Sequence, residues 1–267
     1  MTTLLNHPPL LAAVLFLMLM IVIEAGFRLA TWTGANLDDA RREQIAASRD
    51  ALGILLSLLL AFTLAMALPR FDLRRQLVME EANAIGTTAL RTNMLPDADQ
   101  VPVRALLLQY IHARRAYSQS SPSEPAFASA IELTKKLQSA LWQQAEQVAR
   151  QNPTPISALF IVSLNETIDL SEKRLNALEN RIPVTVWFML SLLAFLTSLT
   201  FGYGQRKRFW LVTIISPLMI AVVMGLIADL DSPRSGFLRV DLRSLNRLAH
   251  DLETGSVIPS DAHPPAH

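Results

Sequence analysis

Residues 51–68 read Ala-Leu-Gly-Ile-Leu-Leu-Ser-Leu-Leu-Leu-Ala-Phe-Thr-Leu-Ala-Met-Ala-Leu, and this uncharged run decides the fold. About 18 apolar residues in a helix can cross the roughly 30 Å hydrocarbon core of a bilayer. The chain then passes Pro69 and continues as an amphipathic helix over residues 76–94, which is too polar for lipid. We therefore expect one helical element that leaves the membrane and extends into water, with the rest of the chain packed around it.

The polar half of this element carries a row of polar side chains, here called the polar row. Its members recur at spacings of three and four residues and so share one helix face; they are Gln76, Glu80, Asn83, Thr87 and Arg91. A neighbouring apolar stripe predicts the buried side and consists of Val78, Ala82, Ile85 and Ala89. Gly86 costs about 1 kcal/mol relative to alanine in a helix, which close approach by another helix would offset. The polar row is either a solvated face or a lining that meets copies of itself or an ion.

A basic collar separates the apolar half from the polar half, and it consists of Arg70, Arg74 and Arg75. Repeated in several copies around an axis, these cations would concentrate anions. Phe62, inside the apolar run, is a candidate for a constriction that closes by dewetting. The apolar runs hold so few polar groups that one copy could not enclose a polar pathway, so conduction would require a homo-oligomer.

Composition excludes several classes of function. The net charge is +1 and no basic stripe is present, so we expect no nucleic-acid partner. The absence of cysteine excludes disulfides and thiolate metal sites. The sequence contains no H-E-x-x-H, G-x-S-x-G, P-loop or G-x-G-x-x-G motif, so we expect no enzyme, no cofactor and no metal site.

Four separate apolar runs predict four membrane-spanning helices, near residues 9–30, 51–69, 183–203 and 209–229. In the first, Glu24 and Arg28 are spaced for a helical ion pair near one membrane face. A secretory signal peptide is the alternative for this run. It lacks a basic segment before the run and a convincing cleavage site after it, which favours a retained helix.

The segment between the second and third spans is predicted to be a bundle of about four helices that lies in water. Apolar spacing and proline breaks place its helices at residues 101–119, 126–151 and 156–181, in addition to the helix that continues from the second span. No alternating β pattern occurs. The fold class is therefore all-α: an integral membrane protein with four transmembrane helices and a helical-bundle insert between spans 2 and 3.

The predicted domains follow from these elements: spans 1 and 2 (residues 1–69), the bundle (70–182), spans 3 and 4 (183–231) and a C-terminal segment (232–267). Residues 37–50 are a short polar connection that leads into the second span. In the C-terminal segment, residues 237–240 are short and extended at best, and residues 242–252 form a last amphipathic helix. The tail from residue 255 onward is predicted to be disordered.

Two further features invite a functional reading and have a plainer one. His112 lies on a bundle helix, where a half-buried structural histidine is commoner than a metal ligand. Asp229 and Asp231 follow the fourth span; they indicate either a helix-terminal turn with Arg234 as counter-ion or a cation site.

Several blocks resemble the bestrophin-like family of bacterial and plant membrane proteins of unknown function. They are residues 57–63, Ser-Leu-Leu-Leu-Ala-Phe-Thr; 70–75, Arg-Phe-Asp-Leu-Arg-Arg; 81–91, Glu-Ala-Asn-Ala-Ile-Gly-Thr-Thr-Ala-Leu-Arg; Leu95-Pro96; 104–110; 181–183; and 229–236, Asp-Leu-Asp-Ser-Pro-Arg-Ser-Gly. The resemblance covers most of the chain, and the block at 81–91 is its most specific part. The family is distantly similar to bestrophins, which are pentameric anion channels with four spans and a cytosolic helical domain. The acidic calcium-binding cluster of animal bestrophins has no clear match here, so calcium gating is not implied.

The resemblance implies a multi-pass protein of the cell (inner) membrane, with the bundle and both termini in the cytoplasm. Basic residues near the membrane ends do not orient the chain, because both sides carry them, and the uncharged N-terminus argues for the opposite orientation. The expected partners are the lipid bilayer, further copies of the chain and small anions. Two functions stay open: an oligomeric anion channel of bestrophin type, and a non-conducting membrane scaffold or sensor whose bundle binds a partner.

Overall fold

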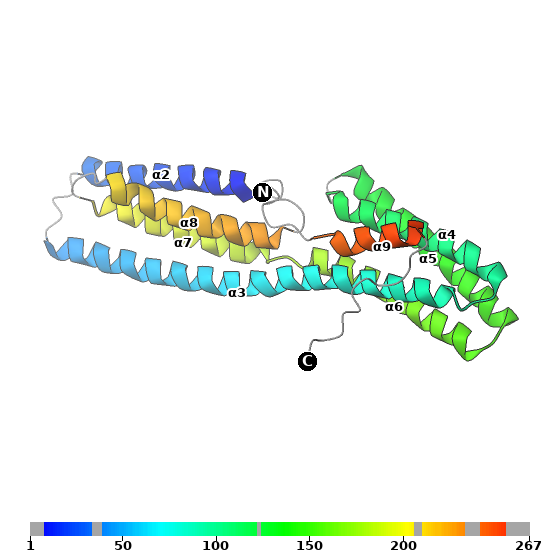
Figure 1. The fold of residues 1–267 in the computed structure, drawn as a ribbon. Helices are drawn as coiled ribbons and strands as arrows, with labels where there is room; N and C mark the ends of the chain where they lie inside the picture. The colour runs from blue at the N-terminus through cyan, green and yellow to red at the C-terminus, as the bar shows by residue number, and fades with distance from the viewer. Residues whose placement is uncertain (1–7, 34–38, 122–123, 206–209, 233–240, 255–267) are drawn as a thin grey trace, which may run out of the picture. The chain divides into compact units, whose positions relative to one another are not determined.

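The computed structural model describes residues 8–33, 39–121, 124–205, 210–232 and 241–254, and within these ranges it contains helices and no strand. Its helices are α2 (Pro8–Trp32), α3 (Asp39–Thr92), α4 (Asp97–Gln119), α5 (Pro125–Gln151), α6 (Pro155–Glu179), α7 (Val184–Tyr203), α8 (Trp210–Asp231) and α9 (Arg243–Thr254) (Figure 1). The all-α prediction is therefore confirmed.

The chain divides into two compact units, and helix α3 contributes to both. The membrane unit comprises Met1–Phe71 and Asn180–Arg239, and the bundle unit comprises Asp72–Glu179 and Val240–His267. Helix α3 is a single helix of 54 residues that includes Pro69. The sequence predicted this continuation past the proline, and the polar connection at residues 39–50 belongs to the same helix.

The membrane unit contains the apolar helices. Four helical stretches are long and apolar enough to cross a membrane, and they lie within Pro8–Trp32, Ala40–Thr92, Pro155–Tyr203 and Thr213–Asp231. In Figure 1, α2, α7, α8 and the first half of α3 run alongside one another. Their shared core includes Leu19 of α2, Leu56 of α3, Leu190 of α7 and Met224 of α8. Four spans were predicted from the sequence, and this prediction is confirmed.

Glycines set the closest helix contacts of the membrane unit. A Cβ atom added to Gly202 of α7 would collide with the backbone of Ile23 on α2, and one added to Gly26 would collide with the carbonyl oxygen of Leu199. Lipid is as apolar as leucine, so spans gain little from apolar burial against each other and associate through close packing of small residues. These two glycines allow the backbones of α2 and α7 to touch.

The bundle unit buries one face of each of its helices around a common core. The apolar stripe on α3 is fully buried, as predicted, and it packs with Leu107, Tyr110 and Ile111 of α4, with Leu141 of α5 and with Phe160 of α6. The final helix α9 completes this core through Leu245, Ala249 and Leu252. The predicted amphipathic helix at 242–252 is confirmed, and the bundle contains one more helix than the about four expected.

Helix ends agree with the sequence to within a few residues. Helix α4 begins at Asp97 rather than at residue 101, and Asp97 and Asp99 occupy its first turn, where acidic side chains stabilise a helix. The predictions for residues 237–240, for Arg234 and for the tail from 255 onward lie outside the described residues.

Candidate functional site

The polar row lies on α3 within the bundle unit and is largely on the surface of a single copy. Gln76, Asn83 and Thr87 are exposed, and Glu80 is half-buried. The Gln76 side-chain amide donates to Glu80 Oε1 at 2.7 Å, as the spacing of four residues allows. Arg91 differs from the others because its Nη1 donates to the carbonyl oxygen of Leu159 at 2.6 Å, which ties the end of α3 to α6.

The first half of α3, in the membrane unit, also leaves one face uncovered. Ile54, Leu58 and Phe62 recur at spacings of four residues and are exposed, with Phe62 61% accessible. The intervening turns bury Leu56 and Leu60 against the other spans. A large aromatic side chain that its own unit does not cover faces lipid or another copy of the chain.

The basic collar is not one continuous surface. Arg75 is exposed, whereas Arg74 is buried, with only 4% of its surface accessible. Arg70 is partly buried. Residues 74 and 75 are separated by about 100° around a helix, so they face different surroundings. In a single copy, Arg75 is the collar residue that is open to solvent.

A buried ionic cluster lies beside the polar row, and the sequence predictions did not include it. Glu81 is 0% accessible, and it accepts hydrogen bonds from Arg114 Nε of α4 at 2.6 Å and from Arg174 Nη1 of α6. Arg174 Nη2 also donates to Ser118 Oγ at 2.9 Å. The side chains of Arg114 and Arg174 are 3% and 7% accessible. One carboxylate therefore joins three helices at the centre of the bundle unit.

Aromatic and hydroxyl groups surround this ionic cluster. The Arg114 guanidinium carbon lies 4.3 Å from the centre of the Tyr117 ring, a cation–π distance, and Arg174 lies 5.6 Å from the same ring. Tyr117 in turn stacks on Phe127 at 5.2 Å. Both guanidinium groups of the cluster therefore lie near the face of the Tyr117 ring.

The pKa of Glu81 is set by two opposing effects. Burial by itself would raise the pKa of this carboxyl, but the charges of Arg174 and Arg114 and their hydrogen bonds outweigh burial and lower it. The pKa of the nearby Tyr110 is raised, first by burial and then by the negative charge of Glu81. Glu81 is therefore ionised, and Tyr110 neutral, throughout the physiological range.

The acidic pair after the fourth span belongs to the membrane unit. Asp229 and Asp231 are buried, and Asp231 Oδ1 accepts the backbone N–H of Ile182 at 2.9 Å, just before α7 begins. This bond joins the end of α8 to the start of α7, which supports the plainer reading of a helix-terminal turn.

His112 contacts an acidic residue of the last helix. Its Nε2 lies 3.3 Å from Glu253 Oε1, and both side chains are about half exposed. Across the residues described by the structure, no group of three histidine, cysteine, aspartate or glutamate side chains is arranged to hold a metal ion.

The bestrophin-like domain matches residues 15–245 of this sequence. Since this match covers most of the chain, the protein belongs to the bestrophin-like family. It is a membrane protein of that family, with four apolar helices suited to span a bilayer. No curated protein matches the sequence.

Solved structures of a bacterial bestrophin homologue from Klebsiella pneumoniae share this fold. One is 14% identical with a TM-score of 0.68 and covers 92% of this chain and 97% of its own. Two variants of that homologue give TM-scores of 0.67 and 0.65 at 15% and 16% identity, each covering 91% of this chain and 98% of its own. At such identities the similarity establishes the common fold.

Proposed function

We propose that the protein is an oligomeric anion channel of bestrophin type in which helix α3 lines the pathway. The observation that carries this proposal is the uncovered face of α3. In the span it presents Ile54, Leu58 and Phe62, and in the bundle unit it presents the polar row. Membership of the bestrophin-like family supports the same reading.

Several copies around an axis would give each part of this face a role. Phe62 from each copy would form an apolar constriction that excludes water when it is narrow. Gln76, Asn83 and Thr87 would line a wider polar section. Arg75 is the exposed collar residue and would supply the positive charge that concentrates anions. The negative charge of Glu80 opposes this attraction of anions. The positive charges of Arg91 and of the half-buried Arg70 offset that of Glu80.

Recording of the purified oligomer in planar bilayers tests this proposal. Arg75→Glu should reduce the preference for anions over cations, whereas Arg150→Glu, at a residue of α5 that is 83% exposed, should leave it unchanged. Arg74→Glu is a poorer test because Arg74 is buried and the change would disturb the bundle unit. If Arg75→Glu leaves the preference for anions unchanged, the basic collar does not contribute to the pathway.

A second pair of variants tests the constriction. Phe62 is 61% exposed on α3 and Phe188 is 60% exposed on α7, so the two differ in helix rather than in exposure. Phe62→Ala should raise the single-channel conductance, whereas Phe188→Ala should not. Equal effects of the two variants would contradict a lining role for α3.

A non-conducting scaffold or sensor is the second candidate. It is favoured by a row of exposed apolar side chains on α6 of the bundle unit, formed by Ile156, Leu159 and Val162. Such a row is suited to a protein partner. Silent bilayers from a folded oligomer would favour this candidate over the channel.

We further propose that the bundle unit lies in the cytoplasm and the protein in the cell (inner) membrane. The sequence contains no cysteine, so single introduced cysteines can be labelled without background. Ser139→Cys on α5 should react in inverted vesicles and be protected in intact cells from an impermeant maleimide. Labelling of this cysteine in intact cells would show that the bundle unit lies on the outer side of the membrane.

A further inference from the structure

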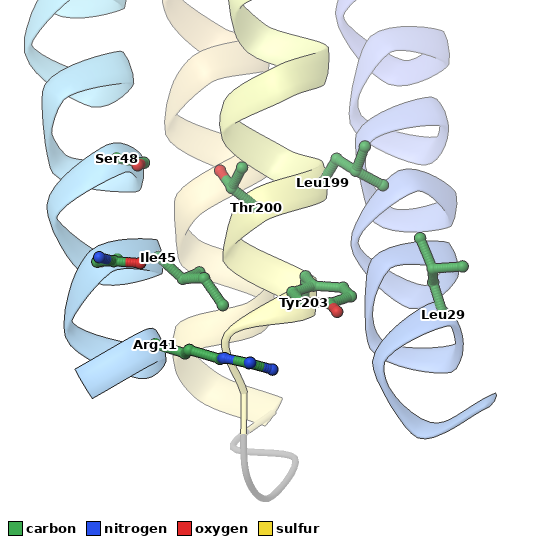
Figure 2. A pocket seen from close by; sticks show the side chains of 8 residues that line it. Leu29, Arg41, Ile45, Ser48, Leu199, Thr200 and Tyr203 are labelled. Carbon is green, nitrogen blue, oxygen red and sulfur yellow. The ribbon is translucent and has the colours of Figure 1, made fainter. Parts of the chain in front are cut away.

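An open pocket of about 540 Å³ lies in the membrane unit where α2 and α7 end and α3 begins (Figure 2). One part of its lining is apolar and consists of Leu29 of α2, Ile45 of α3 and Leu199 of α7. Sites that hold small organic molecules span about 300–1,000 Å³, so the pocket is large enough for more than a single inorganic ion.

The other part of the lining is polar. Arg41, Gln44 and Ser48 follow one another along α3 at spacings of three and four residues, and Tyr203 faces them from α7. Figure 2 shows the Arg41 side chain reaching from α3 toward α7 and Tyr203, with Ile45 one turn further along pointing the same way. Guanidinium, amide and hydroxyl groups can all donate hydrogen bonds to a phosphate.

Aromatic residues stand at the helix ends around this part of the membrane unit, a pattern typical of the level where a bilayer meets water. Tyr203 is the last residue of α7, and exposed tryptophans stand at neighbouring helix ends, at Trp32 of α2 and Trp210 of α8. Tyrosine and tryptophan are enriched at this level of membrane proteins. Arg41 lies in the first turn of α3, where the helix dipole disfavours a cation; an anion beside it is favoured by both the dipole and the guanidinium.

We propose that this pocket binds an anionic phospholipid, with the headgroup phosphate at Arg41 and Tyr203 and an acyl chain along Leu29, Ile45 and Leu199. The apolar lining selects a lipid over free phosphate, because an inorganic ion gains nothing from contact with leucine and isoleucine. The pocket lies within the membrane unit, at the C-terminal ends of α2 and α7 and the N-terminal end of α3. This inference requires the four spans but not conduction, so silent bilayers would leave it intact.

The test uses the full-length protein in mild detergent. Phosphatidylglycerol, phosphatidylcholine and inorganic phosphate are added separately, and native mass spectrometry and the thermal unfolding midpoint report binding. Phosphatidylglycerol should remain bound and raise the midpoint, whereas the other two should have little effect. Arg41→Gln should weaken the apparent affinity for phosphatidylglycerol about tenfold, since a charge-assisted hydrogen bond is lost.

Arg28→Gln is the matched control. Arg28 lies near the same end of α2, makes its ion pair with Glu24 at 2.7 Å and does not line the pocket. If Arg28→Gln and Arg41→Gln lose equal affinity for phosphatidylglycerol, the attraction to charged lipid is diffuse and the proposed site is wrong. Equal stabilisation by inorganic phosphate, or by phosphatidylcholine, would overturn an anionic lipid as the occupant. The wild-type comparison of the three additives decides this even if Arg41→Gln folds poorly.

Discussion

The two units of the protein hold their helices together with different residues. In the membrane unit, Gly26 and Gly202 let two spans approach until their backbones touch. In the bundle unit, the interior holds large side chains such as Tyr110 and Phe160 and, among them, the ionised Glu81 with its two arginines. Small residues bring the spans together, and an ionic cluster joins the helices that lie in water.

This difference follows from the solvent on each side. In water, burying apolar surface drives helices together, so the bundle unit can accommodate the desolvation of one carboxylate and two guanidinium groups. In lipid that driving force is absent, and close contact between backbones becomes the main source of attraction. A cluster such as the one at Glu81 fixes which helices meet, whereas a glycine fixes how closely they approach.

The largest effect is expected from Glu81→Gln. Removal of the carboxylate charge leaves two buried guanidinium groups without a counter-charge, which should destabilise the bundle unit by about 3–5 kcal/mol. Trp142, which packs against the bundle core, provides a fluorescence signal for unfolding of that unit. The matched control is Glu80→Gln, at a half-buried neighbour bonded to Gln76, which should change stability by less than about 0.5 kcal/mol. Equal effects of the two variants would show that the buried cluster does not hold the bundle together.

The stability of wild type and that of Glu81→Gln should also depend differently on pH. The folded-state pKa of Glu81 lies below the unfolded value of 4.5, so its carboxylate stabilises the folded state above pH 4.5, and this stabilisation is lost as the pH falls through the folded pKa. The stability gap between wild type and Glu81→Gln should therefore be constant near neutral pH and narrow below 4.5. A gap that narrows around pH 6–7 instead would mean that the pKa of Glu81 is raised.

An intermediate effect is expected from Gly202→Ala. A methyl group there would meet the backbone of Ile23, which cannot move as a flexible side chain can, and overpacking of this kind costs about 1–3 kcal/mol. Gly53→Ala is the control, because a Cβ at Gly53 of α3 has no neighbour within 4 Å. The thermal unfolding midpoint in detergent should fall for the first variant and stay or rise for the second. If both behave alike, the close approach of α2 and α7 is not what stabilises the membrane unit.

The smallest effect, and one of opposite sign, is expected from Gly86→Ala in the bundle unit. A Cβ there would lie 3.5 Å from Leu248 Cδ1 of α9, an ordinary contact, so the alanine should fit and stabilise α3 by up to about 1 kcal/mol. Unfolding followed by Trp142 fluorescence measures this gain. Loss of oligomer with the bundle still folded would instead indicate that Gly86 is needed for contact between copies.

Most of the fold could be predicted from apolar spacing. The runs that became α2, α7 and α8 are long and apolar, and the stripe from Val78 to Ala89 is buried as its period requires. Helix α4 begins at Asp97, before the predicted start at residue 101, and it includes Pro102. A proline ends a helix only where packing does not compensate for its missing hydrogen bond.

The ionic cluster was missed although the sequence contains a signal for it. Glu81 falls between Val78 and Ile85 on the apolar stripe, Arg114 falls between Tyr110 and Tyr117, and Arg174 repeats this pattern on α6. A charge on a buried face indicates an internal partner. The identity of the partner depends on how three helices meet, which spacing within one helix does not contain. The burial of Arg74 beside the exposed Arg75 likewise depends on tertiary packing.

Helix α9 has a consequence for the order in which the protein is made. Synthesis proceeds from the N-terminus, so α9 leaves the ribosome after all four spans and after the rest of the bundle. Leu245, Ala249 and Leu252 are buried parts of the core, and until they arrive the apolar surface that they cover is open to water. Maturation of the bundle unit therefore ends after insertion of the spans, and a nascent chain stalled before residue 242 would present that surface to chaperones and proteases.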